Sequence, residues 1–217
     1  MHIPDGLIAP HTYIPAFAIV TPLWALAWRR VRRADPDTLL PRIAVFTALA
    51  FVLSTLMIPL PGGTSAHALG IGLMALLFGP WTAFLAYTLV LLLQSLVMGA
   101  GGITALGVNA LAMGFTGAWC TVLLARWLAP AGDGPAVVMA VWVGMVLPAA
   151  LVALVLGVQP LLHVDDAGRP LFFPFGPTIT LPWIVGPHAV VALGEVAVTL
   201  AVVRHARRRG WLDGGAP

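Results

Sequence analysis

Long apolar segments alternate with short breaks rich in glycine, proline or arginine along most of the chain. A helix needs roughly 20 apolar residues to cross the hydrocarbon core of a bilayer, and most of these segments approach that length. The pattern predicts an all-α integral membrane fold of about seven helices, at Thr12–Trp28, Leu39–Leu60, His67–Phe78, Trp81–Met98, Thr104–Ala129, Pro135–Val158 and Leu181–Val203.

The composition requires lipid as the surrounding solvent. Hydrophobic residues make up 60% of the 217 residues and charged residues only 9%, whereas soluble domains carry about 25% charged residues. The pI of about 10.0 would suit a nucleic-acid partner, but all eleven basic residues are arginines and ten of them flank apolar segments. We therefore interpret them as topology signals and expect membrane lipid, not nucleic acid, around this chain.

The arginines also predict an orientation. If the cluster at residues 29–33 is cytoplasmic, the N-terminus is extracytoplasmic, the C-terminus is cytoplasmic, and only Arg169 lies outside. The arginines placed inside are then Arg29, Arg30, Arg32, Arg33, Arg42, Arg126, Arg204, Arg207, Arg208 and Arg209. We expect one domain, with residues 1–11 as an extracytoplasmic loop, 12–203 as the transmembrane helices and 204–217 as a cytoplasmic tail.

The third apolar segment is too short to span a membrane. Its helix, expected at His67–Phe78, ends at the break Gly79-Pro80 and would be roughly 18 Å long. The preceding loop, PLPGGTSA, is therefore expected to dip inward. Irregular backbone at membrane depth requires protein or a wet cavity around it, so we expect a cavity on the outer side.

A histidine directly after the first residue creates a chelate that uses the main chain. The Met1 amine and the Met1-His2 amide nitrogen close a five-membered ring on a metal, and His2 Nδ1 closes a six-membered ring. The three nitrogens lie in one plane. Because square-planar nitrogen sites favour Ni(II) or Cu(II), we expect a metal site here with His67 as the fourth ligand.

The chelate needs a free amine on Met1. We expect Met1 to be retained, because histidine is too large a second residue for initiator-methionine removal and the first apolar segment lacks a signal peptide's basic start and cleavage pattern. With an α-amino pKa of about 7.7–8, affinity should rise from mildly acidic to neutral pH. Ser65 is expected to cap the third helix and to place His67 in its first turn, where the helix dipole favours a neutral ring.

Each of the predicted ligands also has an explanation that needs no metal. His2 alone would be typical of a frayed terminus, and His67 alone would be typical of the first residue of a helix. Because both are expected on the same side of the membrane, we favour a metal site. His188 and Glu195 share a helix face and are expected near the ligands, or else in an internal hydrogen-bond pair with groups such as Asn109 or Gln94. The residues expected around the ligands are Asp5, Ser65, Asn109, His188 and Glu195. The residues expected as solvated loop positions, which can guide cations, are His11, His163, Asp165 and Asp166.

Several chemistries are excluded by what the chain does not contain. It has no lysine, so a P-loop is impossible, and it has no HExxH motif. Cys120 is the single cysteine and lies in an apolar run, which excludes a thiolate cage. No organic cofactor is expected, and we expect no enzymatic activity, with any ATP hydrolysis carried out by partner subunits.

The segments MHIPDGLI, GGTSAHALGIGLMALLFGPW, LVMGAGGITALGVNALAMG and PHAVVALGEVAVT closely resemble the CbiM/NikM membrane subunits, the substrate-specificity components of energy-coupling-factor importers for cobalt and nickel. The resemblance implies an N-terminal helix before a six-helix core, a loop that plugs the metal pocket, and ligands at Met1, His2 and His67. It also implies a scaffold transmembrane subunit, ATP-binding subunits, a small auxiliary membrane subunit as a separate chain, and the bacterial or archaeal cytoplasmic (inner) membrane.

One position departs from the family pattern. Where a second asparagine is expected after GVN, this chain has Ala112, so a network through that side chain is not expected here. We expect Ni2+ or Co2+ as transported substrate, without a preference between them. One rival interpretation is an ion-coupled secondary divalent-metal transporter, in which Glu195 would have to act as the acidic relay. The other is a membrane metalloenzyme, which is disfavoured because the chain lacks a general base paired with an open metal site.

Overall fold

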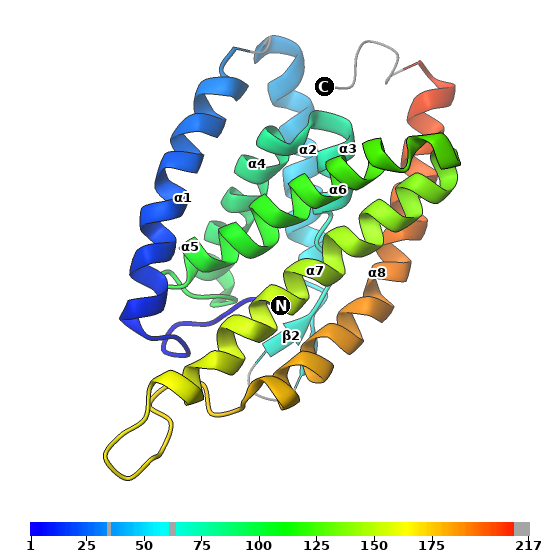
Figure 1. Ribbon diagram of the computed structural model, residues 1–217. Helices are drawn as coiled ribbons and strands as arrows, with labels where there is room; N and C mark the ends of the chain where they lie inside the picture. Colours follow the sequence, from blue (N-terminus) through cyan, green and yellow to red (C-terminus); the bar gives the residue numbers. More distant parts are fainter. Residues whose placement is uncertain (34–35, 61–63, 211–217) are drawn as a thin grey trace.

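The computed structural model describes residues 1–33, 36–60 and 64–210. Its helices pack side by side into one bundle (Figure 1). The principal helices are α1 (Pro10–Val31), α2 (Pro36–Ser54), α3 (Ile71–Phe78), α4 (Pro80–Leu93), α5 (Leu106–Asn109), α6 (Gly117–Trp127), α7 (Asp133–Leu162) and α8 (Pro177–Arg208). The shorter elements are the π-helices η1 (Gln94–Met98) and η2 (Ala110–Thr116), the 3-10 turn η3 (Ala129–Ala131), and the strands β1 (Ile58–Leu60) and β2 (Thr64–Ala66).

The predicted all-helical membrane fold is confirmed, with one short hairpin added. Within the described residues, four continuous helices are long and apolar enough to cross a membrane: Pro80–Met98, Leu106–Trp127, Asp133–Leu162 and Pro177–Arg208. Two of them contain a π-helical turn, because η1 continues α4 and η2 joins α5 to α6. The predicted total of seven crossings stays a prediction.

The third apolar segment forms a shorter helix than the sequence predicts. Strands β1 and β2 pair antiparallel, with Pro59 opposite Ser65, and α3 begins only at Ile71 after Gly70. Gly70 has φ +71°, and a Cβ on it would lie 3.3 Å from the Ala50 Cβ, so a glycine suits this close approach of α2.

The prediction that Ser65 caps α3 and places His67 in its first turn is therefore wrong. Ser65 belongs to strand β2, and His67 lies in the loop between β2 and α3. Its side chain lies outside the part of the structure that is described, so its role near the ligands stays a prediction. The loop does enter the protein, since Ala66 and His67 are 0% and 1% exposed.

Small residues bring the helices together inside this chain. A Cβ on Gly144 of α7 would lie 2.0 Å from the Thr121 Oγ1 of α6, and one on Gly114 would lie 3.1 Å from the Phe84 ring. Glycines at these positions therefore allow close packing between helices of the bundle.

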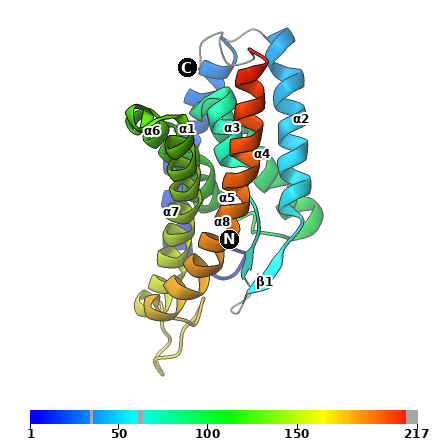
Figure 2. The same cartoon turned by 90° about the vertical axis from the view of Figure 1, so that its right-hand side faces the viewer.

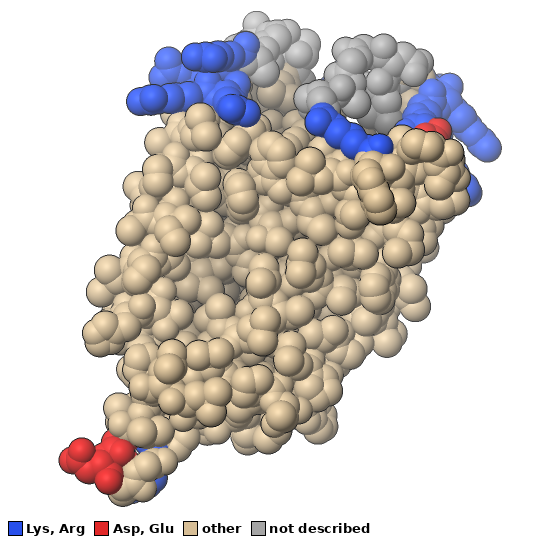
Figure 3. Space-filling view, in the orientation of Figure 1, with Lys and Arg blue, Asp and Glu red and all other residues tan. Residues whose placement is uncertain are grey.

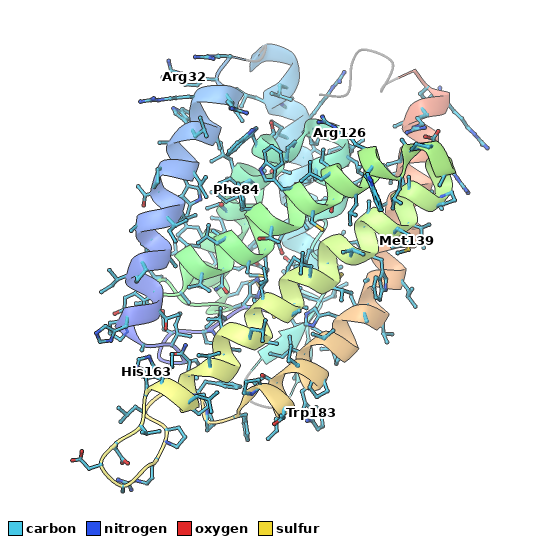
Figure 4. The ribbon with its side chains drawn as sticks, in the orientation of Figure 1. Arg32, Phe84, Arg126, Met139, His163 and Trp183 are labelled. Atoms are coloured by element: carbon cyan, nitrogen blue, oxygen red, sulfur yellow. The ribbon has the colours of Figure 1, made fainter. Side chains whose placement is uncertain are left out.

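Charge is distributed unequally between the two ends of the bundle. Figure 3 shows arginines at the end where α1 and α8 finish, and Figure 4 places Arg32 and Arg126 there and His163 at the opposite end. At the arginine-rich end, Arg207 forms an ion pair with Asp133, and the Arg30 guanidinium lies 4.8 Å from the Trp81 ring centroid. We call it the basic end and the other the acidic end, where Asp165 pairs with Arg169.

The charge asymmetry yields a test of orientation. In a Cys120→Ala background, an Asp166→Cys protein should react with a membrane-impermeant maleimide in intact cells, because the acidic end is expected to face outward. An Arg33→Cys protein, with its cysteine at the basic end, should react only after the membrane is permeabilised. Labelling of Arg33→Cys in intact cells would reverse the predicted orientation.

Candidate metal-binding site

The first three residues are buried in the bundle instead of fraying from it. Met1, His2 and Ile3 are 0%, 3% and 0% exposed, and both Figure 1 and Figure 2 place the N-terminus beside the β-hairpin. Asn109 of α5 holds the main chain of Ile3 at both sides: Asn109 Oδ1 accepts from the Ile3 N–H at 3.0 Å, and Asn109 Nδ2 donates to the Ile3 carbonyl at 3.1 Å. The backbone immediately after His2 is thereby fixed.

The glycine-rich loop before α5 forms the other wall around the N-terminal segment. The Gly102 N–H donates to the Ile3 carbonyl at 2.9 Å, and the Asp5 carboxylate accepts from the N–H groups of Ile103 at 3.1 Å and Thr104 at 2.8 Å. A Cβ on Gly102 would lie 2.3 Å from Asp5 Oδ1, so only glycine allows this approach. The Asp5 side chain therefore caps this turn, and its expected role around the ligands stays a prediction.

His67 faces His2 although the two are far apart in the sequence. His67 Nε2 lies 3.2 Å from His2 Nδ1, and the rings are stacked with centroids 4.5 Å apart and an interplanar angle of 18°. On its other side, His67 Nδ1 lies 2.9 Å from the Ala68 carbonyl oxygen. The two side chains predicted as ligands are therefore brought together, with one nitrogen of each ring pointing at the other ring.

Glu195 of α8 secures the loop that carries His67. Its carboxylate accepts from the N–H groups of Leu69 at 2.8 Å and Gly70 at 3.1 Å, directly before α3. A carboxylate at a helix N-terminus is favoured by the helix dipole as well as by these hydrogen bonds. Glu195 thus supplies the capping role that the sequence had suggested for Ser65.

His188 lies on the same helix as Glu195, and it makes a different kind of contact. It is fully buried, and its Nδ1 lies 2.7 Å from the Ile184 carbonyl of its own helix. The internal pair of His188 and Glu195 with Asn109 or Gln94, considered from the sequence, is replaced by separate partners for each residue. Glu195 binds the backbone of the loop and Asn109 binds the backbone of Ile3.

Burial keeps the nitrogen atoms of the site uncharged. It lowers the pKa of the Met1 amine from 8.0 to about 4, and burial, followed by the charge of that amine, lowers the pKa of His67 to about 3. Burial also lowers the pKa of His2 well below its ordinary value, with smaller contributions from His67 and the amine, while Gln94 favours the protonated ring. At neutral pH the three groups offer lone pairs instead of positive charges.

The donor set suits a metal only if the main chain takes part. Within the part of the chain that the structure describes, no three His, Cys, Asp or Glu side chains lie close enough to hold a metal ion. Two ligands at right angles around a metal, each about 2.0 Å from it, are about 2.8 Å apart. The 3.2 Å between His2 Nδ1 and His67 Nε2 is close to that spacing.

The remaining candidates lie away from these ligands or have other partners. The rings of His11 and His163 are stacked at the acidic end with centroids 6.0 Å apart. Asp165 accepts from the N–H groups of Ala167 and Arg169 in its own loop. Ala112 is buried in η2, at 5% exposure.

Two glutamines hold positions that sequence reasoning did not assign to the site. Gln159 Oε1 accepts from the Ala9 N–H at 3.0 Å, which ties the N-terminal segment to α7. Gln94 is fully buried, and its Nε2 donates to the Ser54 hydroxyl at 2.6 Å. A buried amide inside an apolar helix costs free energy unless it is hydrogen-bonded. The presence of a glutamine within an apolar segment was therefore a sequence feature that could have identified both residues.

Curated relatives with similar sequences are metal transport proteins. The chain is 38% identical over 215 residues to the fused nickel transport protein NikMN of Rhodobacter capsulatus, covering 96% of this chain and 62% of that protein. It is 37% identical over 154 residues to the cobalt transport protein CbiM of Roseiflexus sp., covering 70% of this chain and 59% of that protein. The chain thus spans less than two thirds of the length of these relatives.

A solved structure and a family model agree with these relatives. The crystal structure of a transition metal transporter superposes with a TM-score of 0.92 at 33% identity, covering 96% of this chain and 93% of the other. Residues 2–211 match the model described as CbiM, cobalt uptake substrate-specific transmembrane region. The chain is therefore a multi-pass integral membrane protein that belongs to the CbiM family.

Proposed function

We propose that this chain is the metal-capturing membrane subunit of an ATP-driven importer of nickel or cobalt in a bacterial or archaeal cytoplasmic membrane. The observation that carries the proposal is the approach of His67 Nε2 to His2 Nδ1 beside a buried, uncharged Met1 amine. The relatives named as nickel and cobalt transport proteins support the same cargo.

The ligand set is the Met1 amine, the deprotonated His2 amide, His2 Nδ1 and His67 Nε2. The amide shares a chelate ring with the amine and another with Nδ1, so the vacant corner of the square lies opposite the amide and beside Nδ1. His67 Nε2 lies beside Nδ1, as that corner requires. A square plane of nitrogens favours Ni(II), and partner genes and metal supply would decide between nickel and cobalt in the cell.

The energy for import would come from separate subunits. The chain lacks a P-loop, so we propose a transmembrane scaffold with ATP-binding subunits, and an auxiliary membrane subunit, as its partners. The rival secondary transporter needs a carboxylate that exchanges ions or protons inside the membrane. Glu195 is poorly suited to that exchange because two backbone N–H groups hold its carboxylate in place. Metal uptake by proteoliposomes that contain this chain alone would support the rival.

The amine chelate makes the chain sensitive to its exact start. Adding two residues before Met1 should weaken Ni2+ binding by more than about 100-fold, because the new amine can no longer close the five-membered ring with the His2 amide. Two residues are added because a histidine in the third position would form another planar site from the amine, two amides and the ring. Isothermal titration with the purified protein measures this. A glycine inserted after Gly168, in the exposed loop between α7 and α8, serves as the matched control and should bind as the parent protein does. An extended protein that binds as tightly as the parent would contradict the chelate.

Ni2+ affinity should depend on the histidine at the proposed site and not on a histidine elsewhere in the chain. His67→Ala removes a nitrogen that faces His2 and should weaken Ni2+ binding by more than about 100-fold, by loss of a ligand. His11→Ala removes an exposed histidine at the acidic end and should leave the dissociation constant unchanged. Equal losses in the two variants would show that binding is not confined to the proposed site.

Metal affinity should rise with pH. With the N-terminal segment released, the Met1 amine has a pKa of about 8, whereas in the buried position its pKa is about 4. The buried arrangement is therefore fully stable above about pH 8 and loses stability as the pH falls toward 4. Affinity should drop at least about 100-fold between pH 7.5 and pH 5.5, with protons released when Ni2+ is added. A constant dissociation constant over this range would contradict the ligand set.

A further inference from the structure

At the basic end of the bundle, a cavity of about 310 Å³ lies between the start of α7 and the end of α8. Figure 1 shows these two helix ends beside each other. The floor of the cavity is apolar. Val137 of α7 and Val203 of α8 are both 4% exposed, and Leu200 packs against the cluster to which they belong. The interior of the cavity is therefore suited to hydrocarbon.

Three arginines of α8 line the exposed side of the same cavity. Arg207 forms an ion pair with Asp133 of α7. The Arg204 guanidinium reaches the start of α7, where a Cβ on Gly134 would lie 3.7 Å from Arg204 Nη2. Within the described residues, no ion pair involves Arg204 or Arg208. Both of these guanidinium groups are therefore available to an anion.

The charge of the lining favours an anion in the cavity. Its charged residues, three arginines and one aspartate, sum to +2, and α7 begins at the cavity, so the positive end of its helix dipole lies there. A guanidinium presents pairs of N–H donors that match two oxygens of a phosphate. Arg204 and Arg208 are four residues apart on one helix face, so they can bind the same group.

An exposed apolar stripe leads from these arginines toward the middle of the bundle. On α8, Leu193, Ala197 and Leu200 recur at spacings of four and three residues, so they lie on one helix face. Arg204 is the next residue of that face, four positions after Leu200. Leu193 is 60% exposed and Ala197 is exposed as well, and α8 is one of the helices able to cross the membrane. A molecule with an anionic head and an acyl chain would fit the cavity and the stripe together.

We propose that the cavity binds the phosphate group of an anionic phospholipid from the leaflet at the basic end, with an acyl chain along the apolar stripe of α8. Basic pockets between transmembrane helices bind anionic head groups in this way. The bound lipid would bridge the start of α7 and the end of α8. The inference goes beyond the proposed function and uses none of the proposed metal ligands, so its test stands whether or not the chain binds nickel.

Two other anions are attracted by the same arginines. A free phosphate ion would bind the guanidinium groups but would leave the apolar floor and the stripe without a partner. An acidic side chain of a partner protein would likewise use the charge alone. We favour the lipid because the charge and the apolar surface are continuous on one face of α8, and only an amphiphile uses both.

Native mass spectrometry of the purified full-length protein measures lipid binding directly. With phosphatidylglycerol and phosphatidylcholine of identical acyl chains, the protein should bind one phosphatidylglycerol at least about 10-fold more tightly than phosphatidylcholine. Soluble glycerol phosphate in excess should not displace the bound lipid. Equal affinity for the two lipids would overturn the inference, and displacement by glycerol phosphate would assign the cavity to a soluble anion instead.

Variants with matched changes of charge test the position of the site. Arg204→Gln combined with Arg208→Gln should weaken phosphatidylglycerol binding about 10- to 30-fold. Arg32→Gln combined with Arg33→Gln removes the same charge from the basic end outside the cavity and should bind as the parent protein does. All four side chains are exposed, so neither pair of changes disturbs the core. Equal losses in the two proteins would mean that net charge, without a site, attracts the lipid.

A third variant fills the cavity and leaves every charge in place. Leu200→Trp should lower phosphatidylglycerol affinity by a similar factor, because the larger ring occupies the space of the lipid. Val190→Trp, at an exposed position of α8 nearer the acidic end, is the matched control and should have no effect. Parental lipid binding by the Leu200→Trp protein would show that the cavity takes no part, and would contradict the inference.

Discussion

The contact between the rings of His2 and His67 is the constraint on which the rest of the structure depends. His2 reaches it only because the N-terminal segment enters the bundle, and His67 only because the third apolar segment begins as a hairpin and a loop. Buried main chain must find hydrogen-bond partners. Asn109 supplies them on the His2 side, and the Glu195 carboxylate supplies them on the His67 side.

Burial gives this site its chemical character. An apolar surrounding disfavours charged forms, so the Met1 amine and the two rings are held as neutral bases. An uncharged site attracts hydrated cations only weakly. It therefore binds preferentially an ion that exchanges its water for nitrogen ligands. The main-chain nitrogens of the proposed ligand set would add a preference for planar coordination, since the amide nitrogen must lose its proton to bind. Selectivity would therefore follow from ligand chemistry, without any carboxylate among the ligands.

The irregular elements gather around this contact, whereas the regular helices surround them. The hairpin, the loop before α3 and the glycine-rich loop before α5 all border the N-terminal segment, and η1 begins at the buried Gln94. Irregular backbone is tolerated inside a membrane protein where protein satisfies its polar groups. The long helices α7 and α8 lie beside this region (Figure 1) and tie it down through Gln159 and Glu195.

The sequence by itself determined the membrane-embedded helical class, most helix positions and the flanking arginines, and it named Met1, His2 and His67 as candidate ligands, which stay predictions. The class and the helix positions follow from local properties, namely apolar length and flanking arginines, and the proposed chelate follows from the adjacency of Met1 and His2. The sequence misplaced the start of α3 and the capping role of Ser65, because a glycine in the left-handed region and a carboxylate from α8 replaced the local cap. Only the tertiary structure decided which nitrogen of each ring faces the other, and that Gln159 holds the main chain of Ala9. Those features depend on side chains from segments far apart in the chain, and their relative positions are set by packing of the whole bundle.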